Sequence, residues 1–179
     1  VYIRKRYGDL IRVLECDYRE IPDDLKGSFD AVSAVGVLEH VGHKNYEEFF
    51  HIAHRNLKVG GRMLTHTLYT PHSSVASNPW VDKHIFPNGE ISPQPMIERE
   101  ISKYFEPAKD SPYSTFEDIS PHYSPTLHAW KNGLTKAREE GKVQMTEQEF
   151  RKFIFYFMLY AGAIQAGHVK VGQFLYRKK

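Results

Sequence analysis

A glutamate and two histidines follow apolar runs in a pattern that could do chemistry. Glu39 and His40 come directly after the run 29–38, and His66 lies near the end of a second apolar run over 62–68. The first run is rich in Val, which predicts a strand buried on both faces of a parallel sheet. Because ligands bind beyond the carboxyl ends of such strands, Glu39 and His40 are placed for chemistry. The alternative is a carboxylate and an imidazole that only tie down a loop.

A helix and a second strand are expected to complete this unit. Segment 45–57 carries apolar residues at helical spacing, which predicts an amphipathic helix packed on the sheet. Gly60-Gly61 is expected to stop this helix before the strand over 62–68. The apolar stripe of the helix consists of Tyr46, Phe49, Phe50, Ala53 and Leu57.

The residues before the central strand predict further elements. A helix end is predicted over 1–7 and a strand over 10–16, so that Asp17 becomes a second carboxylate at a strand end. Residues 21–28 contain Pro and Gly among polar residues, which indicates a turn or a short distorted helix. Cys16 is interpreted as a small buried hydrophobe on the predicted strand, and a single cysteine fits a reducing compartment.

Beyond residue 68 the periodic pattern is lost until about residue 120, while Pro and aromatic residues accumulate. Loops of this length in compact domains are usually functional, so we interpret 69–120 as a cover over the strand ends. One short helix is predicted within it, over 94–105. The remaining predicted elements are a strand over 116–119, helices over 126–140 and 147–166, and a closing strand over 169–176.

The composition is that of one globular domain. Of 179 residues, 41% are hydrophobic and 13% aromatic, which is enough for a core and excludes disorder. The 24 basic and 22 acidic side chains leave a formal charge of +2, too small to predict a nucleic-acid partner. No run approaches the roughly 18 apolar residues of a membrane helix, so we expect a soluble protein. The histidines show no spacing that converges on a metal, and no metal site is expected.

The start of the chain predicts a fragment. It opens at Val1 rather than Met, in what reads as the end of a helix. The twelve glycines are scattered, and none forms a Gly-rich turn of the kind that cradles a nucleotide between a strand and a helix. If the fold binds a nucleotide, its first strand and turn are expected upstream of residue 1.

Several segments carry a family resemblance, in order across nearly the whole chain. They are Asp17-Tyr18-Arg19, Val35-Gly36-Val37-Leu38-Glu39-His40-Val41-Gly42, Lys44-Asn45-Tyr46, Arg55-Asn56-Leu57-Lys58, His66-Thr67, Pro79-Trp80, Ile85-Phe86-Pro87-Asn88-Gly89 and Leu127-His128-Ala129-Trp130. Each segment is weak alone, whereas together they are specific, the blocks 39–42 and 85–89 above all. With them the sequence resembles the cyclopropane fatty acid synthase family, which includes the mycolic acid cyclopropane synthases.

The resemblance implies a fold. Family members have the α/β, Rossmann-like sheet of class I S-adenosylmethionine-dependent methyltransferases, mostly parallel, with helices on both faces and an inserted acyl-site lid. Residues 1–179 would then be one partial domain, truncated at its N-terminus, with the lid over about 69–120.

The resemblance also implies a reaction. The cis double bond of an unsaturated phospholipid acyl chain attacks the sulfonium methyl group of S-adenosylmethionine, and a carbocation forms. A base, taken in this family to be a bound bicarbonate, then removes a proton from the transferred methyl group so that the cyclopropane ring closes.

Carried over by position, the family's catalytic residues fall on Glu39, His66 and Tyr123. Glu39 would accept the bicarbonate hydroxyl proton, while His66 and Tyr123 would donate hydrogen bonds to its oxygens. The backbone N–H of Leu68 would complete the bicarbonate site. The positions implied for S-adenosylmethionine are Asp17 and the backbone of Val35, Gly36 and Val37.

The sequence departs from the family pattern in its cofactor half. The family's active-site cysteine precedes the Gly-rich loop and would lie upstream of this chain, and Cys16 is in the wrong segment to replace it. A chain without that loop is expected to be inactive, or nearly so, on its own.

Several alternatives stay open. The product could be a cyclopropane or a methyl branch, and a non-catalytic lipid-binding remnant is the second class of function. His40 either contacts substrate or caps backbone groups. The aromatic stripe of the helix 147–166 is either core or part of the acyl pocket, and it consists of Phe150, Phe153, Ile154, Phe157 and Met158.

The expected partners follow from the same resemblance. We expect a cytoplasmic protein that acts on phospholipid acyl chains at the membrane surface, and a homodimer is one assembly open to it. The basic C-terminal residues could meet anionic headgroups, although such a tail is usually just solvated. These residues are Lys170, Arg177, Lys178 and Lys179.

Overall fold

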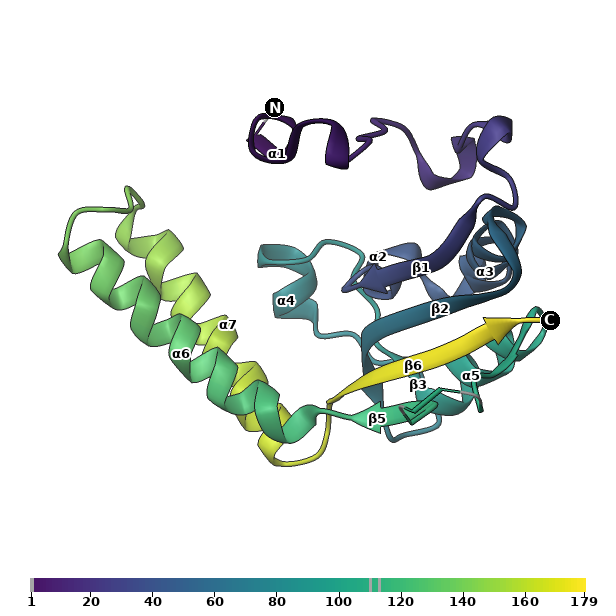
Figure 1. Cartoon of the computed structure of the whole chain (residues 1–179). Helices are drawn as coiled ribbons and strands as arrows, with labels where there is room; N and C mark the ends of the chain where they lie inside the picture. The colour runs from purple at the N-terminus through teal and green to yellow at the C-terminus, as the bar shows by residue number, and fades with distance from the viewer. Residues whose placement is uncertain (1, 110, 113) are drawn as a thin grey trace.

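The computed structural model describes residues 2–109, 111–112 and 114–179, without the side chains of Ile3, Arg4 and Asp9. Its centre is a mixed, open sheet with the order β1-β2-β6-β4, in which β3 pairs with β2 and β5 with β6 (Figure 1). The strands are β1 (Phe29–Val35), β2 (Leu57–Thr70), β3 (Ser92–Pro93), β4 (Phe105–Pro107), β5 (Phe116–Asp118) and β6 (Lys170–Lys178). The α/β class is therefore confirmed.

The sheet is less parallel than expected. β1 and β3 run parallel to β2, whereas the three pairings of β6, with β2, β4 and β5, are antiparallel. Two helices separate β5 from β6 and return the chain to the end of the sheet at which β5 ends. β6 therefore runs antiparallel to both β5 and β2.

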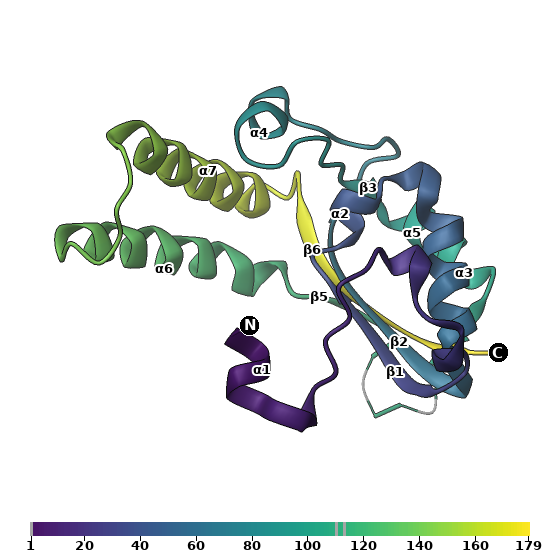
Figure 2. The same cartoon turned by 90° about the horizontal axis from the view of Figure 1, so that it is seen from above.

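The helices separate into two groups. α3 and α5 cover one face of the sheet, while α6 and α7 form a pair that projects from one end of it (Figures 1 and 2). The helices are α1 (Tyr2–Tyr7), α2 (Leu38–Val41), α3 (Tyr46–Asn56), α4 (Pro79–His84), α5 (Gln94–Ser102), α6 (Ser120–Glu139) and α7 (Glu147–Gln165), with short 3-10 turns η1 (Gly8–Leu10), η2 (Tyr18–Glu20), η3 (Asp23–Leu25) and η4 (His43–Asn45).

The core lies between the sheet and the helices α3 and α5. Phe50, Leu57 and Phe174 are fully buried there, and Ile97 and Ile101 of α5 complete the same cluster. The predicted stripe of the helix 45–57 is buried as expected, so that helix is confirmed. The helices predicted near 94 and 147 and the strands predicted near 116 and 169 are confirmed as well.

β1 is not buried on both faces, as its Val-rich sequence predicted. Most of its side chains are exposed, with Phe29 38% and Val35 61% accessible. The reason is its position, since among the described strands β1 pairs only with β2 and forms an edge of the sheet.

Residues 11–17 form no strand, because within the described chain no neighbouring strand offers them a ladder of hydrogen bonds. Leu10, before them, is 88% exposed. Cys16 is consequently an exposed free thiol and not the buried hydrophobe expected. Asp17 is not at a strand end but caps η2, where its side chain accepts from the Arg19 N–H.

Gly60-Gly61 lies inside β2 and does not stop the preceding helix, which already ends at Asn56. The strand pairing jumps here, since Phe29 pairs with Leu57 while Ala31 pairs with Arg62. Gly60 has φ 75°, and a Cβ on Gly61 would lie 2.9 Å from the Lys58 carbonyl oxygen. These glycines therefore allow a bulge.

α6 begins at Ser120, six residues before the predicted start at Thr126. Pro125 lies inside the helix, at its sixth residue. One missing N–H so near the N-terminus removes a single intrahelical hydrogen bond.

Candidate functional site

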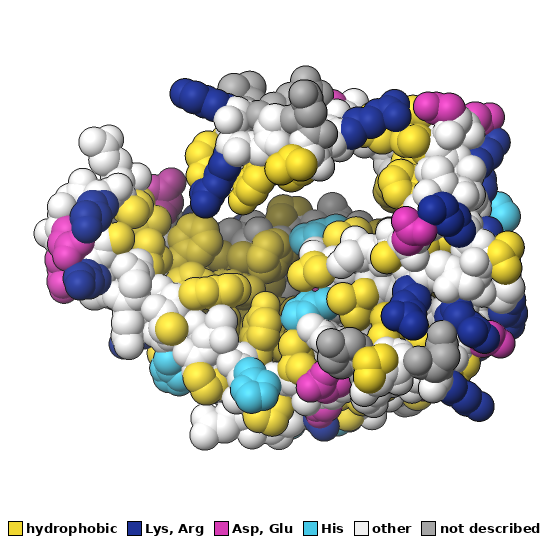
Figure 3. Space-filling model, viewed as in Figure 1, with side chains coloured by type: hydrophobic (Ala, Val, Ile, Leu, Met, Phe, Trp, Pro, Cys, Tyr) yellow, Lys and Arg dark blue, Asp and Glu magenta, His cyan; other side chains and the backbone are white. Residues whose placement is uncertain are grey.

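A cavity of about 310 Å³ opens at the carboxyl ends of β1 and β2, on the side of the α6–α7 pair. Figure 3 shows it as a hollow with largely hydrophobic walls between that pair and the sheet. Four parts of the chain line it: the end of β1 with α2, the end of β2, the segment 76–91, and the inner faces of α6, α7 and β6. The lining residues include Val35, Gly36, Glu39, His40, His66, Leu68, Val81, Phe86, Glu90, Ile91, Tyr123, Tyr156, Leu159, Tyr160, Ala163, Val169 and Val171.

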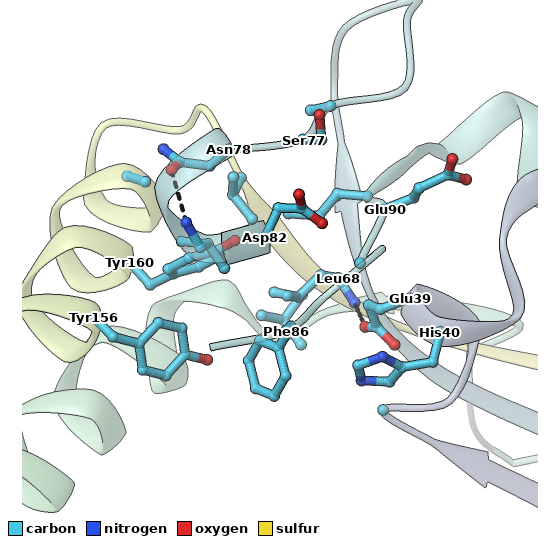
Figure 4. Close-up of a pocket in the computed structure, with 18 of the residues that line it drawn as sticks. Glu39, His40, Leu68, Ser77, Asn78, Asp82, Phe86, Glu90, Tyr156 and Tyr160 are labelled. Atoms are coloured by element: carbon cyan, nitrogen blue, oxygen red, sulfur yellow. Dashed lines mark hydrogen bonds between the residues drawn. The ribbon is translucent and has the colours of Figure 1, made fainter. Parts of the chain in front are cut away.

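Glu39 occupies the place that β1 vacates beside β2. Gly36, with φ 63°, turns the chain out of β1, and its N–H makes the last ladder bond, to the His66 carbonyl oxygen. The Leu68 N–H lies two residues further along β2, and Glu39 Oε1 accepts it at 2.6 Å. Thr67 Oγ1 donates to the same oxygen at 2.9 Å. Figure 4 shows the Glu39–Leu68 bond at the cavity wall.

The second carboxylate oxygen of Glu39, Oε2, is buried and has no hydrogen-bond partner among the described residues. A buried acceptor without a donor is costly, and a charged one especially so. The site is therefore suited to a bound group that brings a hydrogen-bond donor to Glu39.

His66, which precedes Thr67 on β2, also lines the cavity. Its ring Nδ1 lies 3.3 Å from Nε2 of Gln173, the residue directly opposite it on β6. Burial lowers the pKa of His66 from its ordinary value, and the Glu39 carboxylate opposes this in part. His66 is therefore neutral near pH 7 and has one N–H to donate.

Tyr123 of α6 joins these two residues from the opposite wall. Its ring centroid lies 6.5 Å from that of His66. Burial, and then the nearby Glu39 carboxylate, raise the pKa of its hydroxyl, which stays protonated and able to donate. Glu39, His66 and Tyr123 thus line one cavity from three separate elements. Tyr104 lies against His51 and His54 and does not line this cavity.

Two further tyrosines of the cavity were missed by the sequence analysis. Tyr156 and Tyr160 of α7 have hydroxyls on the cavity side, and burial raises the pKa of each (Figure 4). With Leu159 and Ala163, they follow a helical i, i+3, i+4, i+7 spacing, which was the available signal. The aromatic stripe predicted from the sequence lies on an adjacent face of the same helix. Phe157, which belongs to that stripe, packs against a core cluster and does not line the cavity.

A row of aromatic rings crosses the cavity. Phe86 lies between His40 on the α2 side and Tyr156 on the α7 side, with ring centroids 5.4 and 5.6 Å away (Figure 4). His40 therefore lines the cavity, and its contact with substrate stays a prediction.

The segment carrying Phe86 is held by local and distant contacts. Asn88 has φ 60°, and the Gly89 N–H donates to the Phe86 carbonyl oxygen at 3.0 Å, so Pro87-Asn88 forms a type II turn. Glu90 then accepts from His43, at 2.7 Å from its ring and 3.0 Å from its N–H. These bonds tie the cover to the turn that follows α2.

The residues expected to bind cofactor are not gathered in one place. Val35 and Gly36 line the cavity, whereas Val37 and Asp17 do not. Both carboxylate oxygens of Asp17 accept from the Arg19 guanidinium at 2.8 Å, which holds the pKa of Asp17 well below its usual range. The cofactor roles of these four residues stay predictions.

The basic C-terminal residues have partners within the protein. Lys170 pairs with Asp118, and Arg177 with Glu106. Lys178 donates to two backbone carbonyls at the end of α3, and Lys179 to one on α5. No described helix is both long and apolar enough to span a membrane.

The fold, with a cavity at the strand ends, is that of the class I S-adenosylmethionine-dependent methyltransferases. The structure matches that of the cyclopropane synthase MmaA2 from Mycobacterium tuberculosis with a TM-score of 0.81 at 22% identity, covering 99% of this chain and 65% of that one. It also matches the mycolic acid cyclopropane synthase CmaA1, complexed with SAH and CTAB, with a TM-score of 0.78 at 25% identity, over 93% and 60% of the two chains.

The family can be stated as well. The profile of the mycolic acid cyclopropane synthetase family matches residues 4–174, and the chain belongs to this family. The cyclopropane-fatty-acyl-phospholipid synthase of Escherichia coli strain K12 is 33% identical over 171 residues, which are 94% of this chain and 41% of that protein. The chain thus spans about two fifths of this relative's length.

Proposed function

We propose that this chain belongs to a cyclopropane fatty acid synthase that transfers a methylene group from S-adenosylmethionine to the cis double bond of a phospholipid acyl chain. The π electrons of the alkene form a bond to the sulfonium methyl carbon as its bond to sulfur breaks, which releases S-adenosylhomocysteine. Loss of a proton from that carbon then closes the ring. Family membership supports this proposal.

The observation that carries the proposal is the unpaired, buried Oε2 of Glu39 inside an apolar cavity. An apolar wall suits an acyl chain and excludes water from a developing cation, whose charge aromatic faces stabilise. An acyl chain has no hydrogen-bond donor to offer this isolated acceptor. The unpaired oxygen of Glu39 therefore suits a small polar group bound beside the acyl chain.

Bicarbonate fits the polar groups of this wall, and when bound it would supply the base for the departing proton. Glu39 Oε2 would accept a hydrogen bond from the hydroxyl of the ion, while His66 and Tyr123 would donate hydrogen bonds to its other oxygens. The Leu68 N–H, expected to be a fourth partner, already donates to Glu39 Oε1, so it is available only if that bond is exchanged.

The S-adenosylmethionine site is supported less fully by these residues. Val35 and Gly36 would contribute backbone groups where β1 ends, beside the cavity. Asp17 would have to exchange its Arg19 partner to take part. The chain's own contribution to cofactor binding is therefore proposed at the β1 end.

The phospholipid would reach the cavity from a membrane surface that the protein contacts peripherally. Exposed aromatic side chains on α6 and α7 support this, since Trp130 is 47% and Phe155 50% accessible. Phe155 also packs edge-to-face against Trp80 of α4, in the cavity-lining segment. A homodimer is part of the same proposal.

The test is to incubate the whole protein with S-adenosylmethionine and vesicles of cis-monounsaturated phospholipid and to analyse the fatty acids by mass spectrometry. We expect a cyclopropane product whose rate falls in bicarbonate-depleted buffer and recovers when bicarbonate is returned. A methyl-branched product would indicate the related fatty acid methyltransferase reaction. Lipid binding without any transfer from the cofactor would overturn the proposal in favour of a non-catalytic protein.

A further inference from the structure

We infer that Thr67 and Gln173 are positioning residues that decide which atoms of Glu39 and His66 face the cavity as acceptor and donor. The inference deepens the proposed function and rests on it for its catalytic consequence. Neither residue lines the cavity, so each acts through a neighbour that does.

Thr67 fixes the rotation of the Glu39 carboxylate. Its side chain is 1% exposed, and its hydroxyl lies 2.9 Å from Glu39 Oε1 and 3.2 Å from the Leu68 carbonyl oxygen. The single hydroxyl proton favours the nearer, charged acceptor. Together with the Leu68 N–H, it gives Oε1 two donors and leaves Oε2 as the oxygen without one.

The backbone N–H alone does not set this arrangement. A carboxylate with one donor can turn about its last torsion, because that torsion is broad. A second donor on the same oxygen, from a side chain with a restricted χ1 on a central strand, removes that freedom. Thr67 is thus the residue that keeps Oε2 toward the cavity.

Gln173 fixes the tautomer of His66. The two residues are directly opposed on antiparallel strands, and Gln173 Nε2 lies 3.3 Å from His66 Nδ1. An amide N–H that donates to Nδ1 requires that nitrogen to be unprotonated, so the ring proton of neutral His66 resides on Nε2. His66 then offers the cavity a donor from Nε2.

The two contacts have complementary results. Glu39 is held as an acceptor at Oε2, and His66 as a donor at Nε2, before any ligand arrives. A bicarbonate ion has one hydroxyl to donate and further oxygens to accept, so it needs both polarities. Preset polarity of this kind avoids reorganisation during the reaction.

The first experiment replaces Thr67 in the whole protein. Thr67→Val keeps the volume and branching but removes the hydroxyl, while Thr67→Ser keeps the hydroxyl. We expect Thr67→Val to lower turnover on the order of tenfold, with S-adenosylmethionine affinity and melting temperature little changed, and Thr67→Ser to retain most turnover. A crystal structure of Thr67→Val should show the Glu39 carboxylate rotated from its present bond pattern.

A purely structural role for Thr67 predicts something else. Melting temperature and cofactor affinity would then fall with turnover, and Thr67→Ser would fail to rescue. That result, or an unmoved Glu39 in the Thr67→Val crystal structure, would overturn the Thr67 half of the inference.

The second experiment reads the His66 tautomer by nitrogen-15 NMR of the histidine rings, with His66→Asn used to assign the signal. We expect the proton on Nε2 in the native protein. In Gln173→Glu, a carboxylate would accept from Nδ1–H, so the proton should move to Nδ1. The pKa of His66 should also rise, since a carboxylate would be added to the one already near it, Glu39 of α2. The titratable Tyr123 also lies near the ring, with the two ring centroids 6.5 Å apart. Gln173→Met, which offers no such partner, is the control for volume.

A native His66 protonated at Nδ1, or an Nε2 proton that stays in Gln173→Glu, would refute the Gln173 half. Neither NMR nor crystallography needs a lipid substrate. Absence of methylene transfer in the native protein would therefore sink the proposed function alone, while these readouts would still decide the positioning roles.

Discussion

At the residue scale, Glu39 takes two roles from one position. Its Oε1 accepts the Leu68 N–H of β2, beyond the point where β1 leaves the sheet. Its Oε2 has no hydrogen-bond partner among the described residues and is available to a group bound in the cavity. A glutamine at this position would keep the side-chain length and one acceptor oxygen but would lose the negative charge.

We expect Glu39→Gln to lower turnover of the whole protein by a factor on the order of 10² or more, in line with loss of general-base assistance. Affinity for S-adenosylmethionine should change by less than about tenfold. Steady-state kinetics and calorimetric titration measure the two quantities. Equal losses of both would mean that Glu39 mainly maintains the cofactor pocket.

The same substitution makes a prediction for His66 that needs no substrate. Burial lowers the pKa of His66, and the Glu39 carboxylate is the group that raises it in part. Glu39→Gln should therefore lower the His66 pKa further below its ordinary value of 6.5. An NMR titration of the ring measures this. An unchanged or higher pKa would show that the two side chains are not coupled.

At the element scale, the hydrogen bonds from His43 to Glu90 hold segment 76–91 to the turn after α2. Burial alone would raise the pKa of Glu90, but the two hydrogen bonds from His43 outweigh it and the net pKa is lowered. A carboxyl with a lowered folded-state pKa stabilises the fold above its ordinary pKa, and this stabilisation is lost as pH falls through the folded-state value.

Glu90→Gln should therefore destabilise the protein by roughly 1 kcal/mol at neutral pH, since the pair is partly exposed. The difference from the native protein should shrink as the pH falls below the ordinary value of 4.5 and on through the lowered folded-state pKa, because the native carboxyl then loses its charge as well. Denaturant unfolding at several pH values tests this. A difference that is independent of pH would point to lost packing instead.

The junction of β5, β2 and β6 leaves no room for a side chain at Gly172. A Cβ there would lie 2.8 Å from Phe116 Cε2 and 3.0 Å from Tyr69 Cε1. Gly172→Ala should cost about 1–3 kcal/mol of unfolding free energy. The control is Gly162→Ala in α7, where, apart from the chain neighbours and the backbone of its own helix, no described atom lies within 4 Å of the new Cβ. Alanine should stabilise the helix there by up to about 1 kcal/mol, and chemical denaturation should separate the two signs.

At the scale of the whole molecule, the cavity exists only because α7 returns beside the sheet. Ala163, about one turn after Tyr160, has the smallest side chain among the α7 residues that line the cavity. A phenylalanine at this position would occupy part of the proposed acyl site, whereas the β1 end, where cofactor binding is proposed, is formed by other elements.

We expect Ala163→Phe to lower turnover of long-chain phospholipid by about tenfold or more while S-adenosylmethionine affinity stays within about twofold. Ala166→Phe is the matched control, since Ala166 is exposed beyond the end of the same helix and does not line the cavity. Kinetic comparison of the two variants checks this. Similar losses in both would argue that the cavity is not the acyl site.

The sequence by itself determined the features that depend on neighbours in the chain. The stripe of α3, the aromatic helix α7 and the Phe86–Gly89 turn follow from local spacing and residue type. Glu39 and His66 could be identified because each ends a recognisable run, and the family segments pointed to Tyr123.

Only the tertiary structure decided the features that depend on distant neighbours. The Val-rich β1 reads as buried, yet it lies at an edge, because burial depends on which strands pair with it. Thr67 and Gln173 carry no local signal, since their roles arise from partners 28 and 107 residues away. The unpaired oxygen of Glu39 is likewise a result of packing, because a carboxylate has a free face only where the fold withholds a donor from it.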